Sequence, residues 1–514
     1  MVVTPSVLIE SEPEAKPTRA DYRREKRQKE KEAKRQKKEV NEKEKEKCQK
    51  DSLTRKQIRE LKKKSNLFRD LLSIINSYFP DLISQLEGVK DNRHKSYVKY
   101  DISVILLQRI LSAIFSFDSL RSMTSGLNDD NAIKNIAAYL GKEDLDELPH
   151  GDTMNDCFKK MEPDDLQNVI HKMINRLIRR NTFSDSRVAG VEWQILIDAT
   201  ESFRSSKRHC EHCLFSRHKN KSGDVTRISY YHNVLEAKLV INGILVFSIQ
   251  SEFIENEKSI PSEEELFSRA YSMPSKDKVK QDCETKAFYR LADKLKAAFP
   301  SLPICITTDS LYPSKGIFEA CRKLGWHFIM RFKDGSIPQL AKLFYKEVAK
   351  RGWGMHTRLK DDTELDYRYV NDLTYEGFTI NAVRLKDSRV KFPFLFITDY
   401  PITLNNFRRI VEHGRIRWKI ENEGFNRQKN HGYHLKHVFC RDYNAMQVHY
   451  FLIQIAHAIS QLWECSSNMK ILKCSIKEFH ENLKITFLTV LLTDADFEYV
   501  YMRKRIRLEC NPAA

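Results

Sequence analysis

The sequence predicts a mixed α/β protein, in which a helical region precedes a strand-rich one. From residue 66 to about 180 the apolar residues recur at helical spacing, as they do over 67–75. From Val188 the pattern changes to alternating and continuous apolar runs, which are typical of strands. Between two of these runs stands Asn242-Gly243, a dipeptide that favours a tight hairpin.

The strand-rich part has a definite order of elements. Strands are expected at 190–198, 227–240, 243–254, 302–308 and 326–332, and helices at 282–298 and 315–323. The order is therefore three strands that include an antiparallel hairpin, then helix, strand, helix and strand. This is the order of the RNase H fold. Further strands over 352–399 predict a β-rich insertion at about 340–395, and helices follow at 405–429 and 442–464.

At 514 residues the chain exceeds one ordinary domain. We expect a charged tail at 1–64, an all-helical domain at 65–185, an RNase H-like core with its insertion at 186–465 and a C-terminal helical segment at 466–514. The tail holds 22 Lys and Arg against 13 Asp and Glu, a net +9 that is half of the chain's +18. Because this composition cannot bury enough apolar surface to fold alone, the tail is either a solvated helix or a DNA-contacting arm.

The overall composition restricts the class of protein further. A net charge of +18 and an isoelectric point near 9.2 favour a polyanionic partner such as nucleic acid. No apolar stretch reaches the roughly 18 to 20 residues needed to cross a bilayer, and the N-terminus lacks the apolar region of a signal peptide. Eleven cysteines, mostly scattered singly, fit a reducing compartment better than a disulfide framework. We therefore expect a soluble intracellular protein with no membrane partner.

Three acidic positions predict a metal site. Asp198 closes the apolar run 193–198, Asp309 closes the run 302–309, and a third acid lies in the basic helical stretch 415–429. Either Asp alone could cap a turn, so the prediction depends on their joint occurrence in this order. Two Asp and one Glu offer the oxygen ligands that Mg²⁺ prefers. Two such ions would activate a water or a 3′-hydroxyl and neutralise charge at phosphorus in phosphodiester cleavage.

Three short motifs resemble those of insertion-sequence DDE transposases that carry a β-rich insertion before the third acid. They are Ile197-Asp-Ala-Thr200, Thr307-Thr-Asp-Ser-Leu-Tyr312 and Arg417-Trp-Lys-Ile-Glu421, of which the last is similar to part of the signature Tyr-x-x-Arg-x-x-x-Glu-x-x-x-x-x-x-Lys. The resemblance covers about residues 190–465. It implies an RNase H-like catalytic core in which two Mg²⁺ (or Mn²⁺) ions are bound by Asp198, Asp309 and Glu421. It also implies that Arg417 contacts DNA phosphate or positions the acids.

The chain departs from this signature at two positions. Gly414 stands at the place of the Tyr, and Gln428 stands at the place of the Lys, with Lys429 one residue later. The register after Glu421 is therefore open, and Glu423 is a rival for the third acid. On a regular helix Glu423 points about 200° away from Glu421, so the two cannot both face one site.

The same helix offers candidate DNA contacts. They are Arg417, Trp418, Lys419, Arg427 and Lys429, whose cations could contact phosphates. A solvated helix end is the alternative interpretation. Trp418 would either stack on a base or belong to the core.

A second group of residues has the spacing of a zinc site. Cys210 and Cys213 form a C-x-x-C pair in a basic loop over 204–221, with His218 or His209 as a candidate third ligand and the distant Cys283 as a fourth. A structural zinc would stiffen this loop. The alternative is a basic loop with reduced thiols.

The sequence as a whole favours a transposase that cleaves and transfers DNA strands at the ends of an insertion sequence. The resemblance implies DNA as partner, end binding by the helical domain, action as a homodimer on DNA, and a cytoplasmic, nucleoid-associated location in a bacterium or archaeon. An accessory role of Glu284 near the metal stays open. The alternatives are a catalytically inactive or domesticated transposase-derived DNA-binding protein, and a nucleic-acid scaffold in which the acids only cap turns.

Overall fold

The computed structural model describes residues 66–180, 183, 186–256, 260–268, 281–335, 337–467, 475–502, 506 and 508. The chain divides into two units, Met1–Lys64 and Ser65–Ala514, and the described residues belong to the second. The predicted charged tail at 1–64 lies outside the described residues.

The N-terminal part of the described chain is helical, as the apolar spacing predicts. Its helices are α3 (Leu67–Tyr78), α4 (Leu82–Glu87), α5 (Ile102–Ile114), α6 (Leu120–Leu127), α7 (Asp130–Leu140), α8 (Gly151–Phe158) and α9 (Pro163–Ile178), with a short 3₁₀ turn, η1 (Lys95–Tyr97). Local signals fix several of their ends. The Asn66 side chain accepts a hydrogen bond from the backbone N–H of Arg69, and Ser119 and Ser122 form a capping box at the start of α6.

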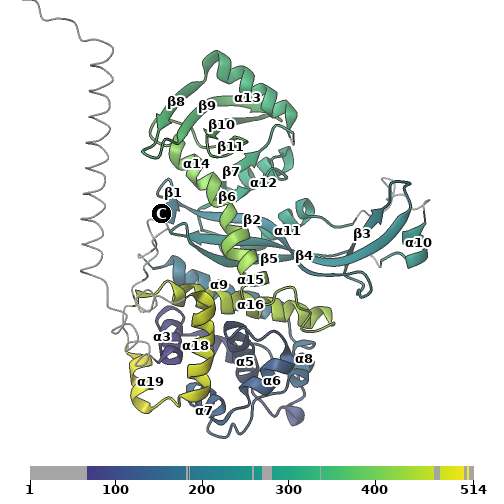
Figure 1. Cartoon of the computed structure of the whole chain (residues 1–514), viewed down its shortest axis with the longest axis vertical. Coiled ribbons are helices and arrows are strands. Elements are labelled where there is room, and N and C mark those ends of the chain that lie inside the picture. Colours follow the sequence, from purple (N-terminus) through teal and green to yellow (C-terminus); the bar gives the residue numbers. More distant parts are fainter. Residues whose placement is uncertain are drawn as a thin grey trace, which may run out of the picture. The chain divides into compact units, whose positions relative to one another are not determined.

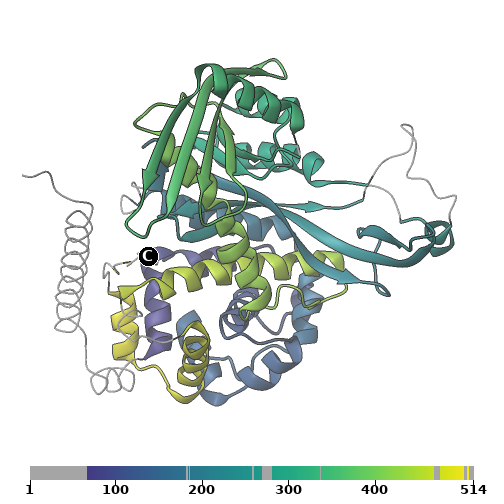
Figure 2. The same ribbon diagram turned by 45° about the horizontal axis from the view of Figure 1, so that its top comes forward.

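The C-terminal helices pack onto this N-terminal region. They are α16 (Tyr443–Glu464), which lies against α5 and α9, α18 (Ile476–Thr489), which lies against α3 and α7, and α19 (Asp494–Tyr501), which lies against α3. Asn135 on α7 donates to the carbonyl oxygens of Phe487 and Val490. The two helical segments that the sequence places at opposite ends of the chain therefore share one helical layer, seen as purple and yellow helices side by side in Figures 1 and 2.

One eleven-stranded mixed sheet spans the middle of the chain. Its strands are β1 (Arg187–Val188), β2 (Glu192–Ser205), β3 (Leu214–Lys219), β4 (Val225–Ile241), β5 (Leu245–Ile254), β6 (Ile304–Thr308), β7 (His327–Phe332), β8 (Trp353–Arg358), β9 (Glu364–Tyr375), β10 (Phe378–Asp387) and β11 (Phe394–Thr398). This sheet, with the helices, confirms the predicted mixed α/β class.

The first part of the sheet has the order β5-β4-β2-β6-β7. The pairs β5–β4 and β4–β2 are antiparallel, whereas β2–β6 and β6–β7 are parallel. β4 and β5 form the predicted hairpin, in which Ile241 pairs with Leu245 and three residues lie between them. The φ angles of 52° at Asn242 and 65° at Gly243 are positive, as at the centre of a turn of the primed type. β3 and β5 pair with successive parts of the same edge of β4.

The predicted insertion extends this sheet. β11 pairs antiparallel with β7, and β10, β9 and β8 follow in turn. The insertion also contains a helix that the sequence interpretation missed, α13 (Pro338–Arg351), which buries Leu340, Ala341 and Phe344 and packs on β9. α12 (Lys315–Leu324) links β6 to β7.

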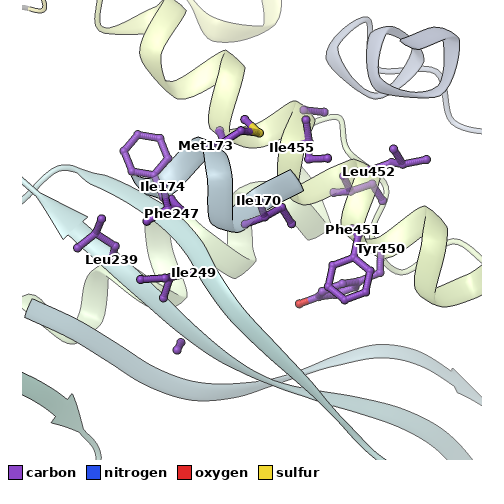
Figure 3. Packing of buried hydrophobic residues seen from close by; sticks show 14 of the residues in the cluster. Ile170, Met173, Ile174, Leu239, Phe247, Ile249, Tyr450, Phe451, Leu452 and Ile455 are labelled. Atoms are coloured by element: carbon purple, nitrogen blue, oxygen red, sulfur yellow. The ribbon is translucent and has the colours of Figure 1, made fainter. Parts of the chain in front are cut away.

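The core between the helical layer and the sheet is apolar. Figure 3 shows Ile170, Met173 and Ile174 of α9 close to Leu239, Phe247 and Ile249 of the sheet and to Tyr450, Phe451, Leu452 and Ile455 of α16. α11 (Glu284–Ala298) packs on β5 and β4 as well. None of the described helices combines the length and apolar character that crossing a membrane requires.

Candidate active site

Asp198 and Asp309 stand at corresponding positions of two neighbouring strands. The parallel pairing of β2 with β6 sets Leu196 opposite Thr307, and each Asp follows two residues later. Oδ1 of Asp198 accepts a hydrogen bond from the backbone N–H of Ala199 at 3.0 Å, and Oδ1 of Asp309 accepts one from the N–H of Leu311 at 2.8 Å. The pairing thus sets the two Asp residues side by side, with Asp309 just past the end of β6 and Asp198 in the middle of β2, which continues to Ser205 and does not end at 198 as the sequence predicts.

The third acid comes from the helical run that follows the insertion. This run consists of α14 (Phe407–Ile416), the π-helical turn η3 (Ile420–Asn426) and α15 (Arg427–Asn430), and it crosses β2 toward α16 (Figures 1 and 2). Nη1 of Arg417 lies 3.1 Å from Oδ2 of Asp198 and 3.1 Å from Oε1 of Glu421. Because its side chain is only 6% exposed, Arg417 is a fixed link between the strand and the helix.

The carboxylates of this site repel one another. Burial, together with the charges of Asp309, Glu421 and Glu284, raises the pKa of Asp198 to about 7 against the opposing effect of Arg417. A divalent cation would relieve this repulsion, and carboxylate oxygens are the ligands that Mg²⁺ prefers. Asp198, Asp309 and Glu421 thus offer the type of oxygen ligand that such an ion prefers.

Glu284 joins this group from α11. Burial raises its pKa, as does the charge of Asp309, while a hydrogen bond from the Tyr312 hydroxyl lowers it. The distance from that hydroxyl to Oε2 of Glu284 is 3.5 Å. Glu284 thus neighbours the predicted triad, which agrees with the open suggestion of an accessory position.

Glu423 points elsewhere. Its Oε1 lies 3.4 Å from Nζ of Lys419, one turn back on the same helix. Glu421, by contrast, shares Arg417 with Asp198. Of the two rival acids, the structure brings Glu421 close to Asp198, through their common contact with Arg417.

The π-helical turn accounts for the shifted lysine. On a regular α-helix, position 428 would lie on the same face as Glu421, because it follows Glu421 by seven residues, or about two turns. A π-helical turn takes up one additional residue, which moves that face to position 429. Gln428 is fully buried and donates to Oε1 of Gln454 at 2.7 Å. Lys429 instead lies near Asp198 and Glu201, whose charges raise its pKa although burial, the larger effect, lowers it.

Gly414 has a steric reason to replace the signature's tyrosine. A Cβ at this position would come within 2.5 Å of the ring of Phe396 on β11. The helix therefore lies so close to the inserted strands that no side chain fits. One residue earlier, Nδ1 of His413 lies 2.9 Å from Oε1 of Gln194 on β2, and Nε2 of Gln194 donates to the His413 carbonyl at 2.7 Å. These contacts fix the helix that carries Arg417.

The predicted DNA-binding residues have different surroundings. Trp418 is 44% exposed, so it does not belong to the core, and the Arg417 guanidinium lies 5.3 Å from its ring centroid. Lys419 is half-buried in its ion pair with Glu423. The environment of Arg427 differs from the predicted one, in which it contacts DNA phosphate. Its Nη2 lies 2.6 Å from Oε2 of Glu464, and both side chains are almost buried. Arg427 therefore holds α15 to α16 and is not available to a phosphate.

Arg331 is a site neighbour that the sequence interpretation missed. It follows the Thr308–Met330 pair of β6 and β7 by one residue. Burial lowers its pKa, the charge of Arg417 lowers it further, and Asp309 and Glu421 raise it. Arg331 could have been found in the sequence because it lies near the end of β7, the strand that neighbours β6, and Asp309 directly follows β6.

The cysteine pair meets a different histidine from the predicted one. Cys210 and Cys213 face Nε2 of His232 on β4, whereas Nε2 of His218 lies 2.9 Å from the Ser229 hydroxyl. The His209 ring packs 4.2 Å from that of Tyr230, centroid to centroid. Cys283 is exposed and stands at the N-cap position of α11, without a side-chain capping hydrogen bond. The predicted basic loop at 204–221 contains the end of β2 and the whole of β3, whose pairing with β4 brings His232 across.

A carboxylate site on a mixed sheet, in a strongly basic chain, is typical of enzymes that process nucleic acids. Residues 281–459 match the family model of the transposase DDE domain. This segment includes Asp309, Arg417 and Glu421, and the match supports a DDE transposase. A comparison with curated proteins gives no match.

Proposed function

We propose that the chain cleaves DNA strands at the ends of an insertion sequence and joins the freed 3′-ends to a target, with Asp198, Asp309 and Glu421 as its catalytic acids. The observation that carries this proposal is the double contact of Arg417, which joins Asp198 and Glu421 at 3.1 Å each while Asp309 stands in register with Asp198. The DDE-domain match over 281–459 supports the same reaction class.

The strand order supports an RNase H-like core. Three antiparallel strands (β5, β4, β2) followed by two parallel ones (β6, β7) form the order expected for that fold, and the insertion of β8–β11 separates β7 from the helix that carries Glu421. In such a core the acids approach from two adjacent strands and one helix. The β-rich segment would therefore support the helix that carries Glu421.

The acids would hold two Mg²⁺ (or Mn²⁺) ions. When bound, such ions activate a water or a 3′-hydroxyl and neutralise the charge that develops at phosphorus. Arg417 keeps Asp198 and Glu421 oriented toward one another, so the ligands are pre-organised. Asp198 serves as a ligand in its ionised form, which a pKa near 7 leaves accessible at neutral pH.

DNA would approach along cationic and aromatic side chains at the rim. Lys429 lies on the face of Asp198 and is suited to a phosphate, and the exposed Trp418 is suited to stacking on a base. In the helical layer, a hollow beside α4 and α9 is lined by Asp81, Gln85, Lys172, Asn175, Arg176, Arg179 and Arg180. Its cationic lining makes it a candidate for binding the element's ends, and we expect a homodimer to bridge two ends.

The test is Mg²⁺-dependent nicking of a supercoiled plasmid that carries the DNA flanking the gene on both sides. We expect nicking by the wild type, nicking by the control Asp293→Asn, an exposed acid on α11, and none by Asp309→Asn. Equal activity of wild type and Asp309→Asn would refute the catalytic assignment. Binding of the flanking DNA without nicking by any form would support the inactive, DNA-binding alternative.

A further inference from the structure

The strands around the cysteine pair form an arm with a small core of its own. The ends of β2 and β4, with β3 and α10 (Glu263–Phe267), extend away from the helical layer in both views (Figures 1 and 2). A separate buried cluster holds the arm together and consists of Cys213, Phe215, Ile228, Tyr230 and Leu266. A core this small gives little stability alone, and small folded units are often stabilised by a metal ion.

Three potential metal ligands converge at the turn of this arm. The Sγ atoms of Cys210 and Cys213 lie 3.8 Å apart, and Nε2 of His232 lies 3.3 Å from the first and 3.2 Å from the second. Among the described residues, these three form the group of metal-ligating side chains close enough to share one ion. The two cysteines come from the turn and the histidine from β4, so an ion would tie the turn to the strand.

The spacing is that of tetrahedral zinc. With Zn–S near 2.3 Å and Zn–N near 2.0 to 2.1 Å, two sulfurs lie about 3.8 Å apart and sulfur and nitrogen about 3.6 Å apart. The observed Sγ–Sγ distance of 3.8 Å agrees with this value and is far from the roughly 2.0 Å of a disulfide. The shorter sulfur–nitrogen distances differ by a few tenths of an ångström.

The imidazole of His232 lacks adequate polar partners. The residue is only 4% exposed, its Nδ1 has no hydrogen-bond partner among the described residues, and its Nε2 contacts two thiols. Thiols are weak hydrogen-bond partners, and burying an unsatisfied polar group costs free energy. A bond from Nε2 to a metal ion would offset this cost.

The neighbouring groups hold the turn in place but do not supply a fourth ligand. The backbone N–H of Cys210 donates to Sγ of Cys213 at 3.4 Å, and the Asn256 side chain donates to the carbonyl oxygen of Cys213 at 2.8 Å. His212 is directed elsewhere, since its ring stacks on that of Tyr443 at 4.2 Å and its Nδ1 pairs with Glu255 at 3.1 Å. Because Cys210 is only half-buried, a water can reach the fourth position.

We propose that Cys210, Cys213 and His232 bind one structural Zn²⁺ ion, with a water as fourth ligand. The ion fixes a turn whose exposed cations, Lys207 and Arg208, stand between β2 and β3. This site is separate from the carboxylates of the candidate active site, and it holds whether or not the chain cleaves DNA.

The first experiment measures metal content in the full chain, purified under reducing conditions without chelator. We expect about one Zn²⁺ per chain and, after exchange, the cobalt(II) absorption bands of thiolate coordination. Cys213→Ser and His232→Asn should lower zinc affinity on the order of tenfold or more. The matched controls His218→Gln and Cys283→Ser, which change the originally predicted ligands, should bind zinc as the wild type does.

Three outcomes would overturn the assignment. The first is a wild type that binds neither Zn²⁺ nor Co²⁺ at a stoichiometric level. The second is binding of Co²⁺ by both ligand variants with the affinity of the wild type. The third is loss of the two thiols to a disulfide in the reduced protein. If Cys213→Ser does not fold, the half-buried Cys210→Ser replaces it. Chelator titration of the wild type then provides a second measurement, in which zinc removal should lower the melting temperature of the wild type and leave that of Cys210→Ser unchanged.

Discussion

Arg417 and Asp198 form a buried ion pair that joins the helical run α14–η3 to β2, with Nη1 of Arg417 3.1 Å from Oδ2 of Asp198. The same nitrogen lies 3.1 Å from Oε1 of Glu421. A cation thus stands between two of the three acids that are proposed to bind metal. It lowers their repulsion, but it also competes with a metal ion for the same oxygens.

The first prediction concerns this competition. Arg417→Gln removes the positive charge between Asp198 and Glu421, so Mn²⁺ should bind about several-fold more tightly. Maximal nicking should nevertheless fall by roughly tenfold or more, because the two carboxylates lose their common anchor. Electron paramagnetic resonance of free Mn²⁺ gives the affinity, and plasmid nicking gives the rate. Arg415→Gln, whose guanidinium lies against the Phe394 ring, is the control; weaker Mn²⁺ binding by Arg417→Gln would contradict the argument.

Much of the site could be predicted from the sequence because it depends on local patterns. Apolar runs indicate the strand that contains Asp198 and the strand that precedes Asp309, and parallel pairing sets the two residues side by side, although β2 continues to Ser205 beyond its predicted end. Helical geometry alone separates Glu421 from Glu423. The mixed α/β class and the Asn242-Gly243 hairpin follow from the same kind of local signal.

Other features depend on contacts between distant segments, for which the sequence carries no local signal. The burial of Arg427 results from Glu464, 37 residues later on another helix. His232 reaches the cysteines only through the register of β4 with β2 and β3. The π-helical turn that moves the lysine to position 429 likewise has no sequence pattern that a regular helix lacks.

The second prediction tests the close approach at Gly414. Gly414→Ala places a Cβ within 2.5 Å of the buried Phe396 ring, so it should lower the free energy of unfolding by about 1 to 3 kcal/mol. Gly414→Tyr, which restores the family signature, should be worse. Denaturant unfolding measures both. Gly335→Ala, where an added Cβ meets nothing within 4 Å, should be nearly neutral, and Phe396→Leu should partly rescue Gly414→Ala. A stable Gly414→Tyr protein would refute the steric explanation.

The third prediction concerns pH. Burial, with a smaller effect of Arg409, lowers the pKa of His413 from 6.5 to about 4. The unfolded chain therefore binds more protons at this residue between these values, and stability should fall as pH decreases from about 6.5 to 4. The full effect is on the order of 3 kcal/mol. Other buried histidines titrate too, so the comparison is with His413→Gln, which should lose less stability over the same range in thermal melts. Identical pH profiles would show that His413 is not the cause.

The last prediction separates a structural cation from a DNA-binding one. Arg427→Ala takes the guanidinium away from the nearly buried Glu464, which keeps only the His480 ring at 3.5 Å, and should cost about 3 to 5 kcal/mol of stability. Lys429→Ala should keep the melting temperature but weaken binding of duplex DNA. The slope of the logarithm of the binding constant against the logarithm of the salt concentration should decrease in magnitude by about one, the loss of one phosphate contact. Adding Gln428→Lys to Lys429→Ala should not restore binding, because position 428 points into the buried contacts with Gln454 and His457. Unfolding curves and fluorescence anisotropy at several salt concentrations measure the two effects. If the lysine at 428 restores DNA binding, the π-helical turn does not set the register of this helix.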